Sequence, residues 1–383
     1  MIERTLAAKM ISLAQKFQVV TLTGPRQSGK TTLVKAVFPD FPYVSLEEPD
    51  IRQFALADPR GFLSNYPNGA ILDEIQNTPE LFSYIQGLVD ANRQVQFILT
   101  GSSNFLLIEK ISQTLAGRTA VLHLLPFSLQ ELEPIAGQYE SLIFKGQYPR
   151  IYDRDIAPTD FYPSYIQTYV ERDVRLMKNI GDINAFIQFT HLCAGRIGQL
   201  LNYTSLANDA GISPNTAKAW LSILESTYIV YRLHPYHRNF NKRLVKSPKL
   251  FFYDTGVACS LLGIHEADQV RLHFLKGSLF ENFIINEFIK HNFNRGKNVQ
   301  PYFWQDNHGK EVDCLLVEGE RVTPVEIKSG KTISSSYLEN IKYWRSLANL
   351  PDDKGYVVYG GDQSLQTSGG ELISWRNLNR ILD

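Results

Sequence analysis

The sequence lacks an excess of charge of either sign. Lys and Arg together number 39 and Asp and Glu together number 39, so the formal net charge of the 383 residues is zero. No overall electrostatic field therefore draws the chain to nucleic acid or to a membrane surface. Binding of either kind has to rest on a local basic patch.

Cysteine is also scarce. Cys193, Cys259 and Cys314 lie far apart in the sequence and form no C-x-x-C pair. This spacing argues against a zinc site and against a disulfide framework, and it fits the reducing environment of the cytoplasm. We therefore expect a cytoplasmic location.

Long apolar runs are absent as well. No stretch approaches the roughly 18 residues of a membrane span. Residues 1–6 include an acid and lack the apolar segment of a signal peptide, so we expect no membrane partner. The hydrophobic content of 44% and the charged content of 20% are typical of a globular chain, and the length allows two or three domains.

The strongest motif present is a complete G-x-x-x-x-G-K-[ST] phosphate-binding loop that begins at Gly24. The flanking residues predict a buried strand at 17–22 and a helix at 32–37, which surround a phosphate with backbone N–H groups and a helix N-terminus. We expect Lys30 to reach the β- and γ-phosphates of ATP and the Thr31 hydroxyl to bind Mg²⁺. The nucleotide-binding residues are then Gly24, Pro25, Arg26, Gln27, Ser28, Gly29, Lys30, Thr31 and Thr32.

A second segment, residues 69–75, is an apolar run that ends in Asp73 and Glu74. It predicts a buried strand with both carboxylates at its carboxyl end, the edge where ligands sit in open α/β sheets. We expect Asp73 to hold Mg²⁺ and Glu74 to polarise the attacking water. The next predicted strand, 96–100, is followed by small polar residues at 101–104. These either contact the γ-phosphate or cap the following helix.

Strands alternate with helices through residue 125, which predicts an α/β fold with a parallel sheet covered on both faces. The phosphate loop, the Leu-Asp-Glu strand end and the T-G-S-S-N strand end resemble an AAA-type P-loop ATPase. More narrowly, the chain resembles the prokaryotic AAA-type ATPases that carry a C-terminal domain of uncharacterised function. The resemblance covers essentially the whole chain and includes four short motifs: L-A-G-R at 115–118, L-P-F-S at 125–128, G-Q-Y-P at 146–149 and Y-V-E-R-D-V at 169–174.

The resemblance makes Arg118 and Arg172 candidates for a cation that acts on the γ-phosphate, either within one subunit or from a neighbour in a homo-oligomer. An arginine suits this role because its planar guanidinium stays charged. The alternative for each arginine is a salt bridge on the surface or in a lid.

The middle of the chain is predicted to be helical, as the lid of the ATPase and a linker, with tyrosines that pack in its interior. Residues 206–217 are typical of a helix-turn-helix, with Gly211 at the turn and Ser213 as the N-cap. Strands predicted at 228–233 and 249–253 add a two-stranded wing. The loop at 237–249 holds five Lys or Arg residues and no acid, so it either tracks a DNA phosphate backbone or is simply solvated.

The C-terminal part combines an acid on a predicted helix, Glu281, with Asp313 on one strand and Glu326-x-Lys328 on the next. This arrangement resembles the core of PD-(D/E)xK nucleases. Glu326 and Lys328 point to the same face of a strand. The resemblance implies that Glu281, Asp313 and Glu326 hold Mg²⁺ while Lys328 orients the attacking water or stabilises charge. The alternative is a structural remnant of such a fold.

These observations predict an α/β chain with an AAA-type ATPase core at 1–135, a helical lid and linker at 136–200, a winged helix at 201–265 and a PD-(D/E)xK nuclease-like domain at 266–383. The first functional hypothesis is Mg²⁺-dependent ATP hydrolysis coupled to nucleic-acid binding or cleavage. The second is an ATP-switched regulatory or assembly protein whose C-terminal domain only docks a partner.

Overall fold

The computed structural model describes residues 2–102, 114–133, 137–169, 180, 182–237, 245–297, 299–350, 355–367 and 369–382. The chain forms two compact units. The first contains Met1–Phe127 with two short returns of the chain, Ser226–Tyr228 and Phe293–Gly296, and the second contains the remaining residues. In the described part of the chain, no helix has the length and apolar character needed to cross a membrane.

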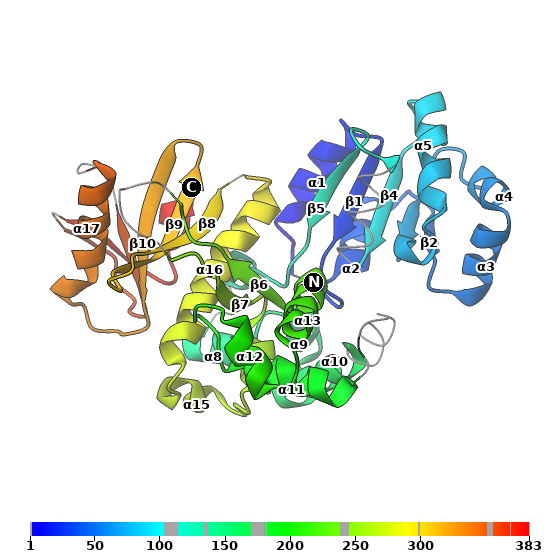
Figure 1. The fold of residues 1–383 in the computed structure, drawn as a ribbon. Helices are drawn as coiled ribbons and strands as arrows, with labels where there is room; N and C mark the ends of the chain where they lie inside the picture. The colour runs from blue at the N-terminus through cyan, green and yellow to red at the C-terminus, as the bar shows by residue number, and fades with distance from the viewer. Residues whose placement is uncertain are drawn as a thin grey trace. The chain divides into compact units, whose positions relative to one another are not determined.

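The first unit is built on a five-stranded sheet with the order β2-β3-β4-β1-β5 (Figure 1). Every neighbouring pair of strands is parallel, and all five residues of β1 are buried. This confirms the α/β class and the parallel sheet predicted from the sequence. The strands are β1 (Val19–Thr23), β2 (Tyr43–Ser45), β3 (Ile71–Asp73), β4 (Phe97–Gly101) and β5 (Thr119–His123).

Helices cover both faces of this sheet because each strand carries apolar side chains on both sides. One face packs against α1 (Leu6–Ala14) and α2 (Lys30–Val37). The other face packs against α3 (Pro49–Ala57), α4 (Pro59–Ser64) and α5 (Leu81–Ala91), with the 3₁₀ turn Ile75–Asn77 beside them. Alternate residues of β1 enter the two cores, with Val19 in one and Val20 in the other.

The second unit begins with helices, as predicted. Tyr162, Tyr165 and Tyr169 are buried, and the Tyr148 and Tyr165 hydroxyls lie 2.8 Å apart. Tyr162 and Tyr165 therefore both pack against Tyr148 in the interior, as the sequence indicated. The helices are α7 (Leu129–Leu132), α8 (Tyr139–Lys145), α9 (Pro149–Arg154), α10 (Pro158–Tyr169) and α11 (Ile183–Ala194).

Two helices, α12 (Tyr203–Asp209) and α13 (Pro214–Ser226), lie where the sequence predicts a helix-turn-helix. Gly211 has a φ of 66° at the turn, and the Ser213 hydroxyl accepts the Thr216 N–H at 3.0 Å. The antiparallel pair β6 (Val230–Leu233) and β7 (Lys249–Phe252) follows. Residues 238–244 of the basic loop lie outside the described residues, so the DNA-binding wing stays a prediction.

The last part of the chain forms a mixed six-stranded sheet with the order β12-β13-β11-β10-β9-β8 (Figure 1). The strands β8 (Gln300–Gln305), β9 (Glu311–Glu318) and β10 (Arg321–Lys328) are antiparallel, and β10 pairs in parallel with β11 (Tyr356–Tyr359). Helices of this part are α14 (Thr255–Leu261), α15 (Ala267–Leu272), α16 (Lys276–Arg295), α17 (Glu339–Ala348) and α18 (Asn379–Leu382), with the 3₁₀ turn Ser335–Leu338.

The polar composition of residues 362–370 is typical of a loop before the last strand, yet they contain the short strand β12 (Leu365–Thr367), which pairs with β13 (Gly370–Ser374). All three residues of β12 are exposed at the edge of the sheet. An edge strand exposed in this way lacks the apolar alternation by which a strand is recognised in a sequence.

A buried carboxylate holds three helical segments of the second unit together. Asp254 is 2% exposed and caps α14 by accepting the N–H groups of Gly256 and Val257. It also accepts the Gln147 N–H and the Tyr162 hydroxyl, each at 2.8 Å. Asp254 therefore links the start of α14 to the G-Q-Y-P segment and to α10.

Replacing Asp254 by alanine should lower the free energy of unfolding by about 2–4 kcal/mol, because buried N–H donors then lose their acceptor. Urea denaturation followed by circular dichroism measures this change. Asp153→Ala on the exposed side of α9 is the matched control and should change stability by less than about 0.5 kcal/mol. Equal effects of the two substitutions would remove Asp254 from this structural role.

Candidate functional site

The phosphate loop has a backbone that demands glycine at its first position. A Cβ atom on Gly24 would lie 2.1 Å from the Leu124 carbonyl oxygen, well inside contact distance. Gly29, directly before α2, has a φ of 91°, in the left-handed region that glycine adopts most easily. The loop therefore passes close to the end of β5 and turns sharply into the N-terminus of α2.

Lys30 and Ser28 give this loop the character of a phosphate site. The buried Lys30 ammonium donates to the carbonyl oxygens of Gly24 at 3.0 Å and Pro25 at 2.8 Å. The Ser28 hydroxyl is buried and has no hydrogen-bond partner among the described residues. A buried hydroxyl without a partner is costly, and a phosphate oxygen would supply the missing acceptor. The loop residues therefore fit a bound nucleotide.

Asp73 lies at the carboxyl end of β3, where the sequence placed it, and contacts Thr31 directly. The Thr31 hydroxyl donates to Asp73 Oδ2 at 2.7 Å. The two oxygens predicted to bind Mg²⁺ thus lie side by side next to the phosphate loop. Hard oxygen ligands from one hydroxyl and one carboxylate suit Mg²⁺, which takes its remaining ligands from water and phosphate.

Two further hydroxyls that the sequence did not identify hold Asp73 in place. The Tyr43 hydroxyl donates to Oδ2 at 2.8 Å, and Thr100 donates to Oδ1. Burial, together with the neighbouring Asp73 charge, raises the pKa of Tyr43 well above its usual value, so the phenol remains a donor. Both residues come from strands that flank β3, and only the strand order reveals them.

Glu74 is oriented by its backbone and by two side chains. Its φ of 55° is left-handed, which is rare for a residue other than glycine and is found at functional sites. The Ser102 hydroxyl donates to Glu74 Oε2 at 3.2 Å, and the Gln76 side-chain amide donates to the same oxygen. Of the small polar residues after β4, Ser102 therefore contacts the candidate catalytic carboxylate, while Ser103 and Asn104 lie outside the described residues.

Arg118 lies at the opposite edge of the sheet from the phosphate loop. It precedes β5, and its carbonyl oxygen accepts the N–H of Val19, the first residue of β1. The guanidinium forms a two-point pair with Asp90, at 2.6 and 2.9 Å. Arg118 therefore cannot reach a γ-phosphate bound at the phosphate loop of its own subunit. Contact with a nucleotide bound to a neighbouring subunit of a homo-oligomer stays a prediction. Arg172 lies outside the described residues.

Arg4 is a residue of the site that sequence reasoning missed. Its guanidinium donates to the carbonyl oxygens of Ser28 at 2.8 Å and Leu125 at 2.6 Å, and it lies 4.8 Å from the centre of the Phe127 ring. Arg4 thus ties the phosphate loop to the L-P-F-S segment. No motif surrounds Arg4, so only its contacts reveal this role.

In the second unit, the predicted strand residues come together. The register of β9 and β10 pairs Val325 with Cys314, which brings Glu326 beside Asp313. The Lys328 ammonium lies 2.9 Å from Asp313 Oδ2 and 2.5 Å from Glu326 Oε2. The Ile327 N–H also donates to Asp313, at 2.7 Å. Asp313, Glu326 and Lys328 therefore form one compact cluster.

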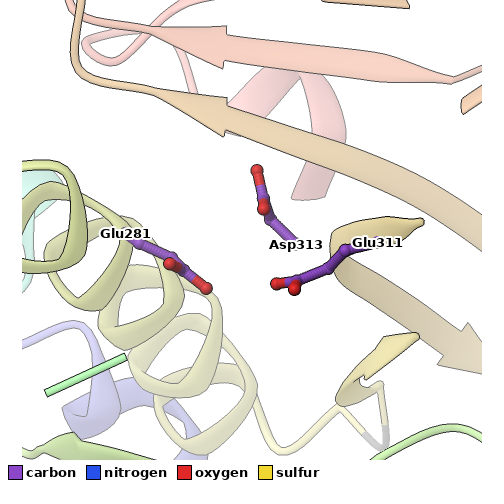
Figure 2. A group of neighbouring side chains, drawn as sticks. All are labelled: Glu281, Glu311 and Asp313. Carbon is purple, nitrogen blue, oxygen red and sulfur yellow. The ribbon is translucent and has the colours of Figure 1, made fainter. Parts of the chain in front are cut away.

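The carboxylates that can share a metal ion differ from the predicted set. Ligand oxygens of Glu281, Glu311 and Asp313 all lie within 4.8 Å of one another. Figure 2 shows Glu281 reaching from α16 toward Glu311 and Asp313 of β9. Glu326 is not in this group. Glu311 was missed, although its position two residues before Asp313 places it on the same face of the strand.

Lys249 corrects a second prediction. It was counted among five cations of a solvated wing loop, but its side chain is only 5% exposed. Its ammonium lies 2.9 Å from Glu281 and also contacts Glu311. Lys249 therefore cannot track a DNA backbone in this arrangement, because it is an internal cation of the carboxylate cluster.

The pKa values in this cluster move in opposite directions. Burial, reinforced by the nearby Asp313 charge, raises the pKa of Glu326 to about 8 against the pull of Lys328. Burial likewise raises the pKa of Glu281 to about 7, although Lys249 opposes it. Burial would also raise the pKa of Asp313, but Lys328 and Lys249 outweigh it and lower that pKa. Asp313 therefore holds its negative charge more firmly than Glu281 or Glu326.

Comparison with known families assigns a class to the first unit. Residues 16–133 match the family described as an AAA domain. With the parallel sheet, the phosphate loop and Asp73, this match makes the first unit a P-loop ATPase domain of the AAA type. Residues 136–268 and 276–378 match two families that are each described as a domain of unknown function, DUF8612 and DUF4143.

Individual relatives match nearly the whole chain. The uncharacterized protein Rv2008c of Mycobacterium tuberculosis is 28% identical, over 95% of this chain and 81% of that protein. The uncharacterized protein MJ1637 of Methanocaldococcus jannaschii is 23% identical, over 94% of this chain and 84% of that protein. The Walker-type ATPase PABY2304 of Pyrococcus abyssi has a TM-score of 0.47 at 15% identity, over 68% of this chain and 96% of that chain. A TM-score this low supports no conclusion about the fold or the function of this chain.

The raised pKa of Glu326 predicts how stability changes with pH. Its folded value of about 8 exceeds the ordinary 4.5, so between these values the folded chain holds a proton that the unfolded chain releases. Its contribution is complete below about pH 4.5 and is lost as the pH rises through 8. The slope is at most about 1.4 kcal/mol per pH unit. In EDTA, Glu326→Gln should reduce the fall in unfolding free energy between pH 5 and 8.

The measurement is urea unfolding at several pH values. Glu318→Gln is the control, because Glu318 is an exposed residue of the same β9 strand, and this variant should keep the slope of the parent chain. A Glu326→Gln variant with an unchanged slope would contradict the raised pKa.

Proposed function

We propose that the chain binds ATP with Mg²⁺ and hydrolyses it at the carboxyl edge of the first sheet. The observation that carries the proposal is the 2.7 Å hydrogen bond from Thr31 to Asp73 beside the phosphate loop. In this proposal Thr31 and Asp73 hold Mg²⁺ or its water ligands. Lys30 exchanges the loop carbonyls for the β- and γ-phosphates, where a cation is needed.

Glu74 is the residue that we assign to the attacking water. A carboxylate acts in this way when it lies next to the γ-phosphate and is held in one orientation. The left-handed backbone at Glu74 and the hydrogen bond from Ser102 support that orientation. Ser102 is then a positioning residue, and Gln76 a second one.

Two substitutions separate binding from hydrolysis. Lys30→Ala should abolish detectable ATP binding, because the ammonium contacts phosphate in the ground state. Glu74→Gln should keep the parent's affinity for ATP and lower the turnover rate by at least about 100-fold, because the amide cannot accept a proton from water. Binding is measured with a fluorescent ATP analogue, and turnover by phosphate release.

The controls are Lys16→Ala and Glu80→Gln, two exposed residues of the first unit, which should leave both quantities unchanged. Undiminished turnover in Glu74→Gln would remove Glu74 from the mechanism. Loss of ATP binding in that variant would show a role in binding instead.

We further propose that the second unit binds a divalent metal ion and cleaves nucleic acid under the control of ATP. The supporting observation is the cluster of Asp313, Glu326 and Lys328, in which Glu326 Oε1 is buried and lacks a hydrogen-bond partner among the described residues. Metal-bound carboxylates with a neighbouring lysine suit phosphodiester hydrolysis. The alternative is a docking surface for a partner that ATP controls through the first unit.

Metal and nuclease assays distinguish these alternatives. Millimolar Mn²⁺ should raise the melting temperature of the parent chain but not that of Asp313→Asn, because only a folded metal site gains stability from the ion. Cleavage of DNA or RNA, tested with and without ATP, should be lost in Lys328→Ala while the Mn²⁺ shift survives. Glu318→Gln is the matched control. If Mn²⁺ does not change the melting temperature of the parent chain, and the chain cleaves neither DNA nor RNA, only the docking alternative is left.

A further inference from the structure

Lys249 occupies a place that is unusual for a lysine. It is carried by β7, whose partner β6 follows the helix-turn-helix, and its side chain is 5% exposed. Its ammonium lies 2.9 Å from Glu281 Oε1 and contacts Glu311 Oε1, so it joins α16 to β9. Lysine is almost never buried unless it is paired. The pairing here uses two of the three carboxylates that lie close enough to share a metal ion.

The charges of the whole cluster do not balance. In the described part of the chain, Glu281, Glu311, Asp313 and Glu326 share two ammonium groups, those of Lys249 and Lys328. When all four carboxyl groups are ionised, two negative charges are left without a counter-charge among these described residues. One divalent cation would balance these two charges once its binding displaces the proton that Glu326 otherwise holds near neutral pH.

An independent observation indicates that the cluster is incomplete as it stands. Glu326 is 1% exposed, and its Oε1 atom has no hydrogen-bond partner among the described residues. A buried carboxyl oxygen without a hydrogen-bond partner is costly, and a metal ion or a metal-bound water would supply that partner. Glu326 lies beside Asp313, which belongs to the group that can share a metal ion.

A divalent ion and the Lys249 ammonium draw on the same two carboxylates, Glu281 and Glu311. A metal ion of this class takes six or more oxygen ligands and carries twice the charge of an ammonium group. An ion shared by Glu281, Glu311 and Asp313 would lie close to the Lys249 ammonium, which contacts Glu281 at 2.9 Å. Repulsion between the two cations disfavours their binding to Glu281 and Glu311 at the same time.

We propose that Lys249 is a tethered counter-cation that competes with a divalent metal ion for Glu281 and Glu311. Metal binding then displaces the Lys249 ammonium from Glu281 and Glu311, and a docked Lys249 weakens metal binding. The two effects are equal in free energy because binding linkage is reciprocal. This inference rests on the metal-binding role proposed above, and it adds Glu311 to the metal ligands.

The test measures Mn²⁺ binding to the full-length chain without nucleotide, with free Mn²⁺ followed by electron paramagnetic resonance. Binding that is absent in Asp313→Asn is assigned to the cluster. Lys249→Met should bind Mn²⁺ there about tenfold more tightly than the parent chain, a coupling of ordinary size. Lys246→Met, which removes an exposed cation three residues earlier, should match the parent.

The outcomes separate this inference from the function on which it rests. If the parent and Lys249→Met both bind no Mn²⁺ at the cluster, the proposed metal role and the inference both fail. If both bind with equal affinity, or if Lys249→Met binds more weakly, the metal role stands and the competition is refuted.

A second measurement uses the parent chain and does not depend on the folding of a variant. Lysine acetylation followed by mass spectrometry should modify Lys249 slowly without metal and at least about fivefold faster in saturating Mn²⁺, because the released amine reaches solvent. Lys290 is the internal control, since it is 1% exposed and is paired with Glu287, away from this cluster. Unchanged labelling of Lys249 with Mn²⁺ bound would overturn the proposal.

Discussion

Buried carboxylates impose the constraint on which much of this structure depends. A carboxylate removed from water has to find hydrogen-bond donors or a counter-charge. Asp73 receives three hydroxyl groups and one N–H, and Asp254 receives three N–H groups and one hydroxyl. The cluster around Asp313 receives two lysines. These three ways of compensating a buried carboxylate have different consequences for function.

Hydroxyl donors leave a carboxylate ready for a metal ion. Thr31, Tyr43 and Thr100 orient Asp73 without neutralising it, so its charge remains available to Mg²⁺. Lysine partners have the opposite effect, because an ammonium group occupies the position and supplies the charge that a metal ion would offer. In the competition proposed for Lys249, a metal ion in the second unit displaces an ammonium, whereas one in the first unit displaces only hydrogen bonds.

The two candidate sites also differ in how far the sequence predicted them. The phosphate loop is local: its residues are consecutive, and its flanking strand and helix follow from apolar patterns, so Lys30 and Thr31 were found without a structure. Asp73 and Glu74 end an apolar run, which is also a local signal. Tyr43, Thr100 and Ser102 were not assigned to contacts with these carboxylates, because such contacts depend on which strands become neighbours. The sequence around Arg4 gave no indication that this residue contacts the phosphate loop.

The amino-acid sequence alone was enough for the α/β class, the parallel sheet, the phosphate loop and the alternation that places Glu326 and Lys328 on one face of a strand. Those features follow from short-range periodicity and backbone geometry. Tertiary structure alone decided three others: Arg118 lies at the edge of the sheet away from the phosphates, Glu311 joins Glu281 and Asp313, and Lys249 is buried between two of these carboxylates. The physical reason is that strand order and helix packing bring together charges that lie tens of residues apart, and no local pattern records which of them will meet.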